Sequence, residues 1–456
     1  MRRPFAGLVG LMCALPGLVA AVEIDSQLWR EMRAELAALR ARVEALERRL
    51  EAAEGGGAPA VASRVVTPTV VEAEDEPAAS NEVPLAAQVP ESPPSQPVTA
   101  AGTALSFGGR IKVDAIASSA SAGAASPLDV RLFPGSLPLA SEGEAGQITG
   151  SARGSRLWFQ ALDAGGGGLA SAYLELDFYG APGGNERVTN SLSPRLRHAY
   201  ASYGPITVGQ TWSTFMNASA FPEINDDGIP VGAVLVRQPL VRYDHRLDGA
   251  VWSLALEAPE TTLASPDGNR VSPDDDRLPE IVGRYRLQGG FGNVALAALV
   301  RELRIDDPGS SERPGAALGF ALGLSGRVAF GADELRFMLS GGNAAGRYVS
   351  ANAFEDGRLD RAGRLDPVMS AGGYLAWQHW WSERWRSNLV AGAAWQGGEG
   401  AADAENERLA SMHANLLFSP MPSTTAGLEV IFARRTRFDG RTGALGRLQL
   451  TALRKF

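Results

Sequence analysis

The chain has 456 residues, 43 basic and 51 acidic side chains, a net charge of −8 and a single cysteine, Cys13. The acidic balance excludes a general nucleic-acid binder, which needs a basic surface. One cysteine excludes a disulfide framework and a cysteine-based zinc site. A mean hydropathy near zero excludes a helical membrane protein but leaves a membrane barrel open.

Residues 1–21 predict a secretory signal peptide. Arg2 and Arg3 precede a short apolar run, and Val19-Ala20-Ala21 supplies the small residues of a cleavage site. The run is too short to cross about 30 Å of hydrocarbon comfortably. We therefore expect an exported protein. Cleavage removes Cys13 with this segment, so the mature chain is expected to have no cysteine.

Residues 22–54 predict a periplasmic coiled coil. Apolar residues recur in two sets spaced by seven, three positions apart, as at the a and d positions of a heptad repeat. An amphipathic helix packed on its own domain is the alternative. An oligomer follows from the coiled coil, although the pattern does not distinguish two strands from three. The predicted core consists of Trp29, Met32, Leu36, Leu39, Val43, Leu46 and Leu50.

Residues 55–102 predict an extended linker. The segment contains eight prolines, six acidic residues and a single basic residue, Arg64. Such a composition buries too little apolar area to offset the entropy of ordering the chain.

Residues 103–456 alternate with a period of two, as expected of strands whose two faces meet different solvents. Turn residues divide them into sixteen strands, so we predict an all-β fold, a sixteen-stranded antiparallel transmembrane barrel. The predicted strands are 104–117, 152–162, 169–179, 195–203, 206–212, 235–245, 250–258, 280–288, 292–302, 316–326, 332–340, 368–381, 384–395, 408–418, 423–434 and 445–456.

The connections between these strands alternate strictly between long and short. Outer-membrane barrels have short periplasmic turns and long external loops, whereas a soluble sandwich has no reason to sort its loops in this way. Trp377, Trp380, Trp381 and Trp385 flank one short turn, as an interfacial aromatic girdle should. The terminal Phe456 resembles the signal that bacterial barrel-assembly machinery recognises. We therefore expect an outer-membrane location, in contact with lipid and lipopolysaccharide.

Four segments carry a resemblance to a known family: FGGRIKVDAI (107–116), SPRLRHAYASYG (193–204), VGQTWSTFMN (208–217) and VRQPLVRY (236–243). They resemble the DcaP-like trimeric outer-membrane porins. The later half of the chain matches mainly in architecture. The resemblance implies a homotrimer and passive uptake of small anionic solutes such as dicarboxylates.

Strand alternation predicts which charged side chains line the pore, because an arginine facing lipid at mid-bilayer costs about 2–4 kcal/mol. Arginine presents a planar fork that matches a carboxylate, so a ladder of them selects anions. The alternative is that these cations pair with Asp114, Glu175, Asp177 and Asp244, and both arrangements can hold in part. The predicted anion-selecting residues are Arg110, Lys112, Arg156, Arg195, Arg197, Arg242, Arg284 and Arg286.

The connection 213–234 resembles the inward loop that narrows sixteen-stranded porins. Its acidic tip, Glu223, Asp226 and Asp227, is expected to stand opposite the arginines of the wall and set a field across the pore. A solvated surface loop is the alternative. Pro239 predicts a bulge or an interrupted ladder in the sixth strand.

No motif supports catalysis or metal binding. The four histidines are scattered, and residues 272–277 lack the spacing of a calcium loop. We predict no enzyme activity and no cofactor. The function expected is a passive porin that favours small anions. The alternative is a structural barrel that tethers the envelope through its coiled coil.

Overall fold

The computed structural model describes residues 98–100, 102–124, 129–142, 146–163, 170–180, 189–306 and 315–456. These residues belong to one unit, Ala79–Phe456. The predicted signal peptide, coiled coil and nearly all of the linker lie outside the described residues and remain predictions.

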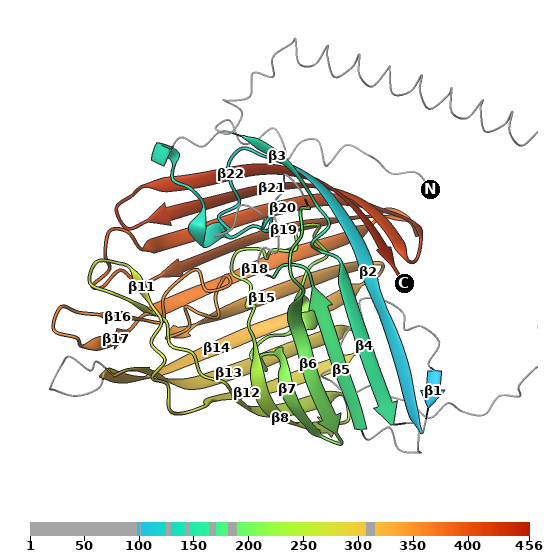
Figure 1. The fold of residues 1–456 in the computed structure, drawn as a ribbon, viewed down its shortest axis with the longest axis horizontal. Helices are drawn as coiled ribbons and strands as arrows, with labels where there is room; N and C mark the ends of the chain where they lie inside the picture. Colours follow the sequence, from blue (N-terminus) through green and yellow to red (C-terminus); the bar gives the residue numbers. More distant parts are fainter. Residues whose placement is uncertain are drawn as a thin grey trace, which may run out of the picture. The chain divides into compact units, whose positions relative to one another are not determined.

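Sixteen long strands form the wall (Figure 1). Each predicted strand has its counterpart, usually within three residues at each end. In chain order they are β2 (Thr103–Ser118), β4 (Arg156–Asp163), β5 (Ala170–Asp177), β6 (Arg195–Tyr203), β7 (Ile206–Trp212), β8 (Arg237–Leu247), β9 (Ala250–Glu257), β12 (Glu280–Gly289), β13 (Gly292–Ile305), β14 (Gly315–Phe330), β15 (Asp333–Asn343), β18 (Met369–Trp380), β19 (Trp385–Gln396), β20 (Asn406–Met421), β21 (Thr424–Arg437) and β22 (Thr442–Lys455).

The sheet closes because its last strand pairs with its first. β22 runs antiparallel to β2, from Lys455 opposite Arg110 to Arg447 opposite Ser118. The backbone N–H of Phe456 donates to the Gly109 carbonyl, and the Gly109 N–H donates to the Phe456 carbonyl. Every neighbouring pair around the ring is antiparallel, which confirms the predicted closed sixteen-stranded barrel.

Short elements accompany the wall. β1 (Val98–Ala100) and β3 (Gln147–Ser151) both pair with β2. A small separate sheet sits in the long loops. Among the described residues, no helix is long and apolar enough to span a bilayer. The remaining elements are β10 (Leu263–Ala264), β11 (Arg270–Val271), β16 (Gly357–Leu359), β17 (Leu365–Pro367), and the 3-10 helices η2 (Pro134–Ser136), η3 (Ala140–Glu142) and η4 (Ala218–Ala220).

The barrel is apolar outside and charged inside. On β2, Ile111 and Val113 are 56% and 51% exposed, whereas their neighbours Lys112 and Asp114 are 3% and 2% exposed. The alternation therefore points apolar side chains away from the barrel axis and charges toward it. Such an exterior is stable against lipid rather than water, because apolar surface is what hydrocarbon solvates best.

One strand, β6, departs from simple alternation, and Pro239 limits the pairing of another. The register between β5 and β6 shifts at Glu175 and Leu176, so Arg197 and His198 are consecutive and both buried. Of the two irregularities predicted at Pro239, the bulge is absent, since β7 and β8 pair without a shift, but the ladder between β8 and β9 is interrupted beside it. Pro239 fits because its nitrogen lies on the β9 side, where the paired ladder ends at Leu240 and Glu257.

Candidate functional site

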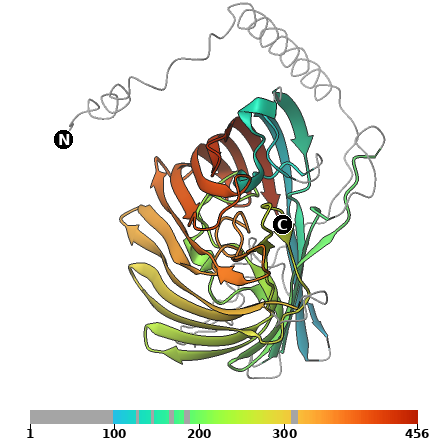
Figure 2. The same ribbon diagram turned by 90° about the vertical axis from the view of Figure 1, so that its left-hand side faces the viewer.

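The segment 213–234, between β7 and β8, runs through the barrel interior rather than over its surface (Figure 2). Arg284 of β12 donates to the Met216 carbonyl at 2.7 Å, and the Tyr374 hydroxyl of β18 donates to the Ala220 carbonyl at 2.9 Å. We call this segment the inner loop. Its contacts extend from β12 around the wall to β2 and β4, so it covers that part of the lumen-facing surface.

Asp227 fastens the loop tip to the first strands. Its carboxylate lies 2.6 Å from Arg110, 3.1 Å from Lys112 and 3.6 Å from Arg156. The Tyr179 hydroxyl donates to it at 3.2 Å. Burial raises the pKa of Asp227, but the three cations together outweigh burial and hold that pKa well below its usual range.

The other two loop acids are also held by the wall. Asp226 lies 3.3 Å from Arg447 of β22 and accepts the Leu132 backbone N–H at 3.2 Å. Burial outweighs the attraction of Arg447, so the pKa of Asp226 is raised. Glu223 makes a two-pronged ion pair with Arg386 of β19, whose Nε lies 2.6 Å away.

The predicted acids therefore do not stand across an open lumen from the predicted arginines. Each contacts a wall cation directly, because the loop lies against the wall. Three of the predicted lining residues, Arg110, Lys112 and Arg156, meet Asp227 and so lie under the loop tip. The field expected across the pore from these acids is largely cancelled at close range.

Most of the remaining predicted cations form ion pairs with acids of the wall itself. This arrangement is the alternative to an anion-selecting ladder that the sequence left open. Arg195 lies 2.7 Å from Asp177, and Arg197 lies 2.5 Å from Glu175 and 3.1 Å from Asp177. On β8, Arg242 lies 3.1 Å from Asp244. The arginines are thus both pore-side residues and members of ion pairs.

The two cations of β12 have neutral hydrogen-bond acceptors. Arg284 donates to the Met216 carbonyl, and Arg286 donates to the Gln288 side chain at 2.9 Å. Both are buried. The five predicted arginines of β6, β8 and β12 are therefore set beside three carboxylates, those of Glu175, Asp177 and Asp244. Arg237 and Arg246 of β8 bring the arginines of these three strands to seven.

A second long connection, 344–356, also packs inside the barrel. Its Tyr348 donates to Glu280 of β12, and Val349 bridges to Val234 at the end of the inner loop. Arg301 of β13 joins this cluster, with Nε 2.9 Å from Glu280 and Nη1 3.1 Å from Asp356. The side chains of Arg301, Glu280 and Asp356 are fully buried and hold the connection 344–356 against the wall, and the bridge from Val349 to Val234 joins this connection to the inner loop.

A cavity of about 610 Å³ opens among the long loops. Arg195 and Tyr179 line it from the barrel side, and Asp129 and Phe133 line it from the first long loop. Arg131 covers the Tyr179 ring at 4.3 Å from its centroid. The cavity places the charged wall in reach of the external medium.

Sequence analysis missed the wall residues that anchor the inner loop, namely Arg336, Arg386 and Arg447. Arg336 donates to the Phe221 carbonyl. All three occupy inward positions by the same alternation that identified Arg110 and Arg242, so extending that rule to the later strands would have found them. The described residues hold no group of histidine, cysteine, aspartate and glutamate side chains placed for a metal ion.

Comparisons with known proteins agree with this architecture. The family model for the DcaP outer membrane protein matches residues 79–456. The outer membrane channel DcaP of Acinetobacter baumannii matches with a TM-score of 0.66 and 18% identity, over 78% of this chain and 99% of that one. OmpF of Salmonella typhi in complex with daunomycin matches with a TM-score of 0.51 and 8% identity, over 79% of this chain and 100% of that one. At these identities the two structures show a shared fold. None of the curated proteins matches.

Proposed function

Because the chain belongs to the DcaP outer membrane protein family, we propose that it is a porin, a passive channel for small hydrophilic solutes that favours anions such as dicarboxylates. A closed barrel with an apolar exterior spans the outer membrane, and its charged interior offers a path to water-soluble solutes. Solutes move down their gradient, so the proposal needs no cofactor.

The observation that carries the anion preference is the unequal neutralisation of the interior. Glu223, Asp226 and Asp227 are each paired with wall cations, so the inner loop adds little negative charge to the pore. The wall from β5 to β12 carries seven arginines, the five predicted ones together with Arg237 and Arg246, against Glu175, Asp177 and Asp244. The two further acids there, Glu257 and Glu280, are held in the buried cluster with Gln238. The surplus of arginine favours an anion in transit.

Recordings in planar bilayers under a salt gradient test this proposal. The wild-type channel is expected to give discrete conductance steps and a reversal potential on the anion side. Arg195→Ala/Arg197→Ala is expected to move that potential toward cations, because it removes two charges and frees Asp177 and Glu175.

A matched control is Arg364→Ala, since Arg364 is 73% exposed on an external loop and pairs with Asp366. This variant is expected to leave selectivity unchanged. Cation selectivity in the wild type, or no discrete steps at all, would rule out the anion porin. Reduction of the chloride current by succinate, but not by acetate at equal charge concentration, would support dicarboxylates as the preferred class.

We also propose that the protein is a homotrimer: the heptad pattern of residues 22–54 supports self-association, and the resemblance of the barrel segments supports three copies. The same helix and the acidic linker also suit the second candidate, a structural tether of the envelope. Deleting 23–102 separates the two roles. Loss of trimers in detergent assigns the helix to assembly, whereas intact trimers and conductance with an altered envelope assign it to tethering.

A further inference from the structure

Two arginines lie close together at one end of the outer face of the barrel, among apolar side chains. Arg408 of β20 and Arg434 of β21 are exposed and occupy outward positions. Further along the same faces, Met412 lies four residues from Arg408 and Phe432 two residues from Arg434, and these side chains are 53% and 60% exposed. Trp395 of β19 pairs directly with Arg408 and is 47% exposed on the same face.

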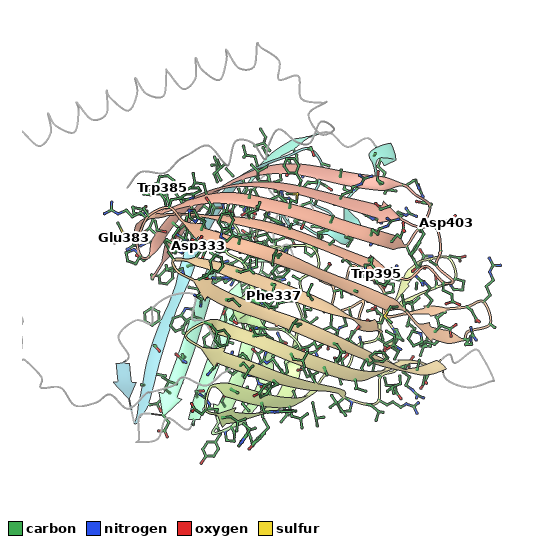
Figure 3. All side chains as sticks on the ribbon, turned by 180° about the vertical axis from the view of Figure 1, so that it is seen from behind. Asp333, Phe337, Glu383, Trp385, Trp395 and Asp403 are labelled. Carbon is green, nitrogen blue, oxygen red and sulfur yellow. The ribbon has the colours of Figure 1, made fainter. Side chains whose placement is uncertain are left out.

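The strand geometry places these cations at the external edge of the membrane. Phe418 marks the opposite edge of β20, where its ring stacks near that of Trp385, 4.6 Å between centroids, beside a short periplasmic turn. The ten residues from Arg408 to Phe418 span about 33 Å along the strand, or about 25 Å across a bilayer at the usual tilt. Figure 3 shows Trp395 near Asp403 at one end of the wall and Trp385 near Glu383 at the other.

The charges of this cluster are incompletely neutralised. Arg434 makes no hydrogen bond or ion pair with any residue that the structure describes. Among the described residues, Arg408 forms an ion pair only with the adjacent Glu407, at 2.7 Å, and its side chain remains 69% exposed. Cross-strand pairing sets Arg408 opposite Thr436 and Arg434 opposite Ala410. The two arginines are therefore diagonal neighbours, and such positions on adjacent strands are about 7–8 Å apart.

A ligand that fits this surface must join an anionic head to an apolar body. Two guanidinium forks match the oxygens of a phosphate, and the exposed Met412 and Phe432 match acyl chains. A tryptophan beside them is suited to the headgroup level. We propose that Arg408, Arg434 and Trp395 form a binding site for a phosphate group of lipid A in the external leaflet.

An arginine at the other end of the barrel provides a matched control. Arg454 of β22 is exposed on the outer face near the periplasmic turns. Its guanidinium already donates to the Thr424 hydroxyl at 2.6 Å and to the Met421 sulfur. It therefore tests whether any exposed arginine on the wall contributes equally to lipid binding.

The experiment is a titration of the full-length protein in detergent with lipid A, followed by native mass spectrometry. Arg408→Gln/Arg434→Gln is expected to weaken binding of bisphosphorylated lipid A about tenfold or more, because charge-assisted bonds to phosphate are lost. Arg454→Gln is expected to bind like wild type. With dephosphorylated lipid A, all three proteins are expected to bind equally weakly.

Equal lipid A affinity in the double variant and wild type would overturn the site, as would an equal loss in Arg454→Gln. A loss confined to phosphatidylglycerol, with lipid A binding intact, would assign the surface to a phospholipid and also overturn it. Heat-modifiable migration on gels checks folding. The single variant Arg434→Gln removes the unpartnered cation alone and is expected to weaken lipid A binding, whereas Arg434→Lys retains part of it.

Discussion

Arg110 and Asp227 are 117 positions apart in the chain, yet Nη2 of the arginine lies 2.6 Å from Oδ1 of the aspartate. This ion pair joins the first strand of the barrel to the tip of the inner loop. Lys112 and Arg156 approach the same carboxylate. One acidic side chain therefore holds three cations at the wall and positions the loop between them.

Asp227→Asn is expected to increase anion selectivity and to loosen the loop. The change keeps the shape of the side chain but leaves three neighbouring cations without their shared acid. Removing one partner of a buried ion pair typically costs about 3–5 kcal/mol of stability, so unfolding in denaturant should occur at a lower midpoint. Reversal potentials and conductance noise in bilayers measure the two functional effects.

Asp439→Asn is the control for this change. Asp439 pairs with Arg441 at 2.7 Å in an external loop and has little to do with the barrel interior. Its replacement should change neither selectivity nor loop stability. If Asp227→Asn and Asp439→Asn behave alike, the loop tip does not depend on its contact with the wall.

The pKa values of the adjacent loop acids are displaced in opposite directions, and this predicts opposite pH dependences. Burial raises the pKa of Asp226, so its carboxyl disfavours folding increasingly as pH rises above the unfolded value of about 3.9. Three cations lower the pKa of Asp227 in the folded protein. Its ionised carboxylate therefore stabilises the fold above the unfolded pKa of about 3.9, and this stabilisation is lost as pH falls through the folded pKa.

The measurement is the free energy of unfolding of wild type, Asp226→Asn and Asp227→Asn from about pH 3 to pH 7 in detergent micelles. As pH rises, Asp226→Asn should gain stability relative to wild type, and Asp227→Asn should lose it. Parallel curves for the two variants would show that the loop acids do not experience these different surroundings. The comparison uses the slope of the free energy of unfolding against pH for each protein, not its absolute value.

The strands were predictable because the alternation of apolar and polar residues within each strand shows which face meets lipid. Ile111, Lys112, Val113 and Asp114 alternate between lipid and lumen, and that alternation is visible without knowing any partner strand. The long and short connections then order the strands into a closed wall. Nothing non-local is needed until the register of the last pair, β22 with β2.

The site was less predictable because its contacts join distant segments. Asn225 meets Glu429 across 204 positions, and Glu223 meets Arg386 across 163. Alternation assigns a face to Arg386 but not a partner. The bulge that turns both Arg197 and His198 inward also breaks the simple alternation rule, since one extra residue shifts the phase of the strand.

Arg301 is expected to be essential for barrel stability rather than for selectivity. Its side chain is fully buried between Glu280 and Asp356. Arg301→Gln takes the arginine away from Asp356 and leaves Glu280 with Arg347, whose Nη1 lies 3.3 Å away. The loss should be about 3–5 kcal/mol in denaturant unfolding. Arg327→Gln is the contrast: Arg327 is 45% exposed beside Glu334, and such surface pairs contribute about 0–1 kcal/mol. Equal losses would show that the buried cluster is not a structural anchor.

Gly232 tests how closely the inner loop lies on the wall. Its φ is +85°, and a Cβ there would collide with the backbone of Gly373 on β18. Gly331 has a similar φ of +66° in a turn, but a Cβ added there meets nothing within 4 Å.

Alanine at either position incurs the left-handed backbone strain, about 1–2 kcal/mol. Only Gly232→Ala must also push the loop away from the wall, so it should lower the unfolding midpoint further and alter single-channel conductance. Conductance unchanged from wild type in Gly232→Ala, with stability equal to that of Gly331→Ala, would mean that the loop has room to move without affecting the pore.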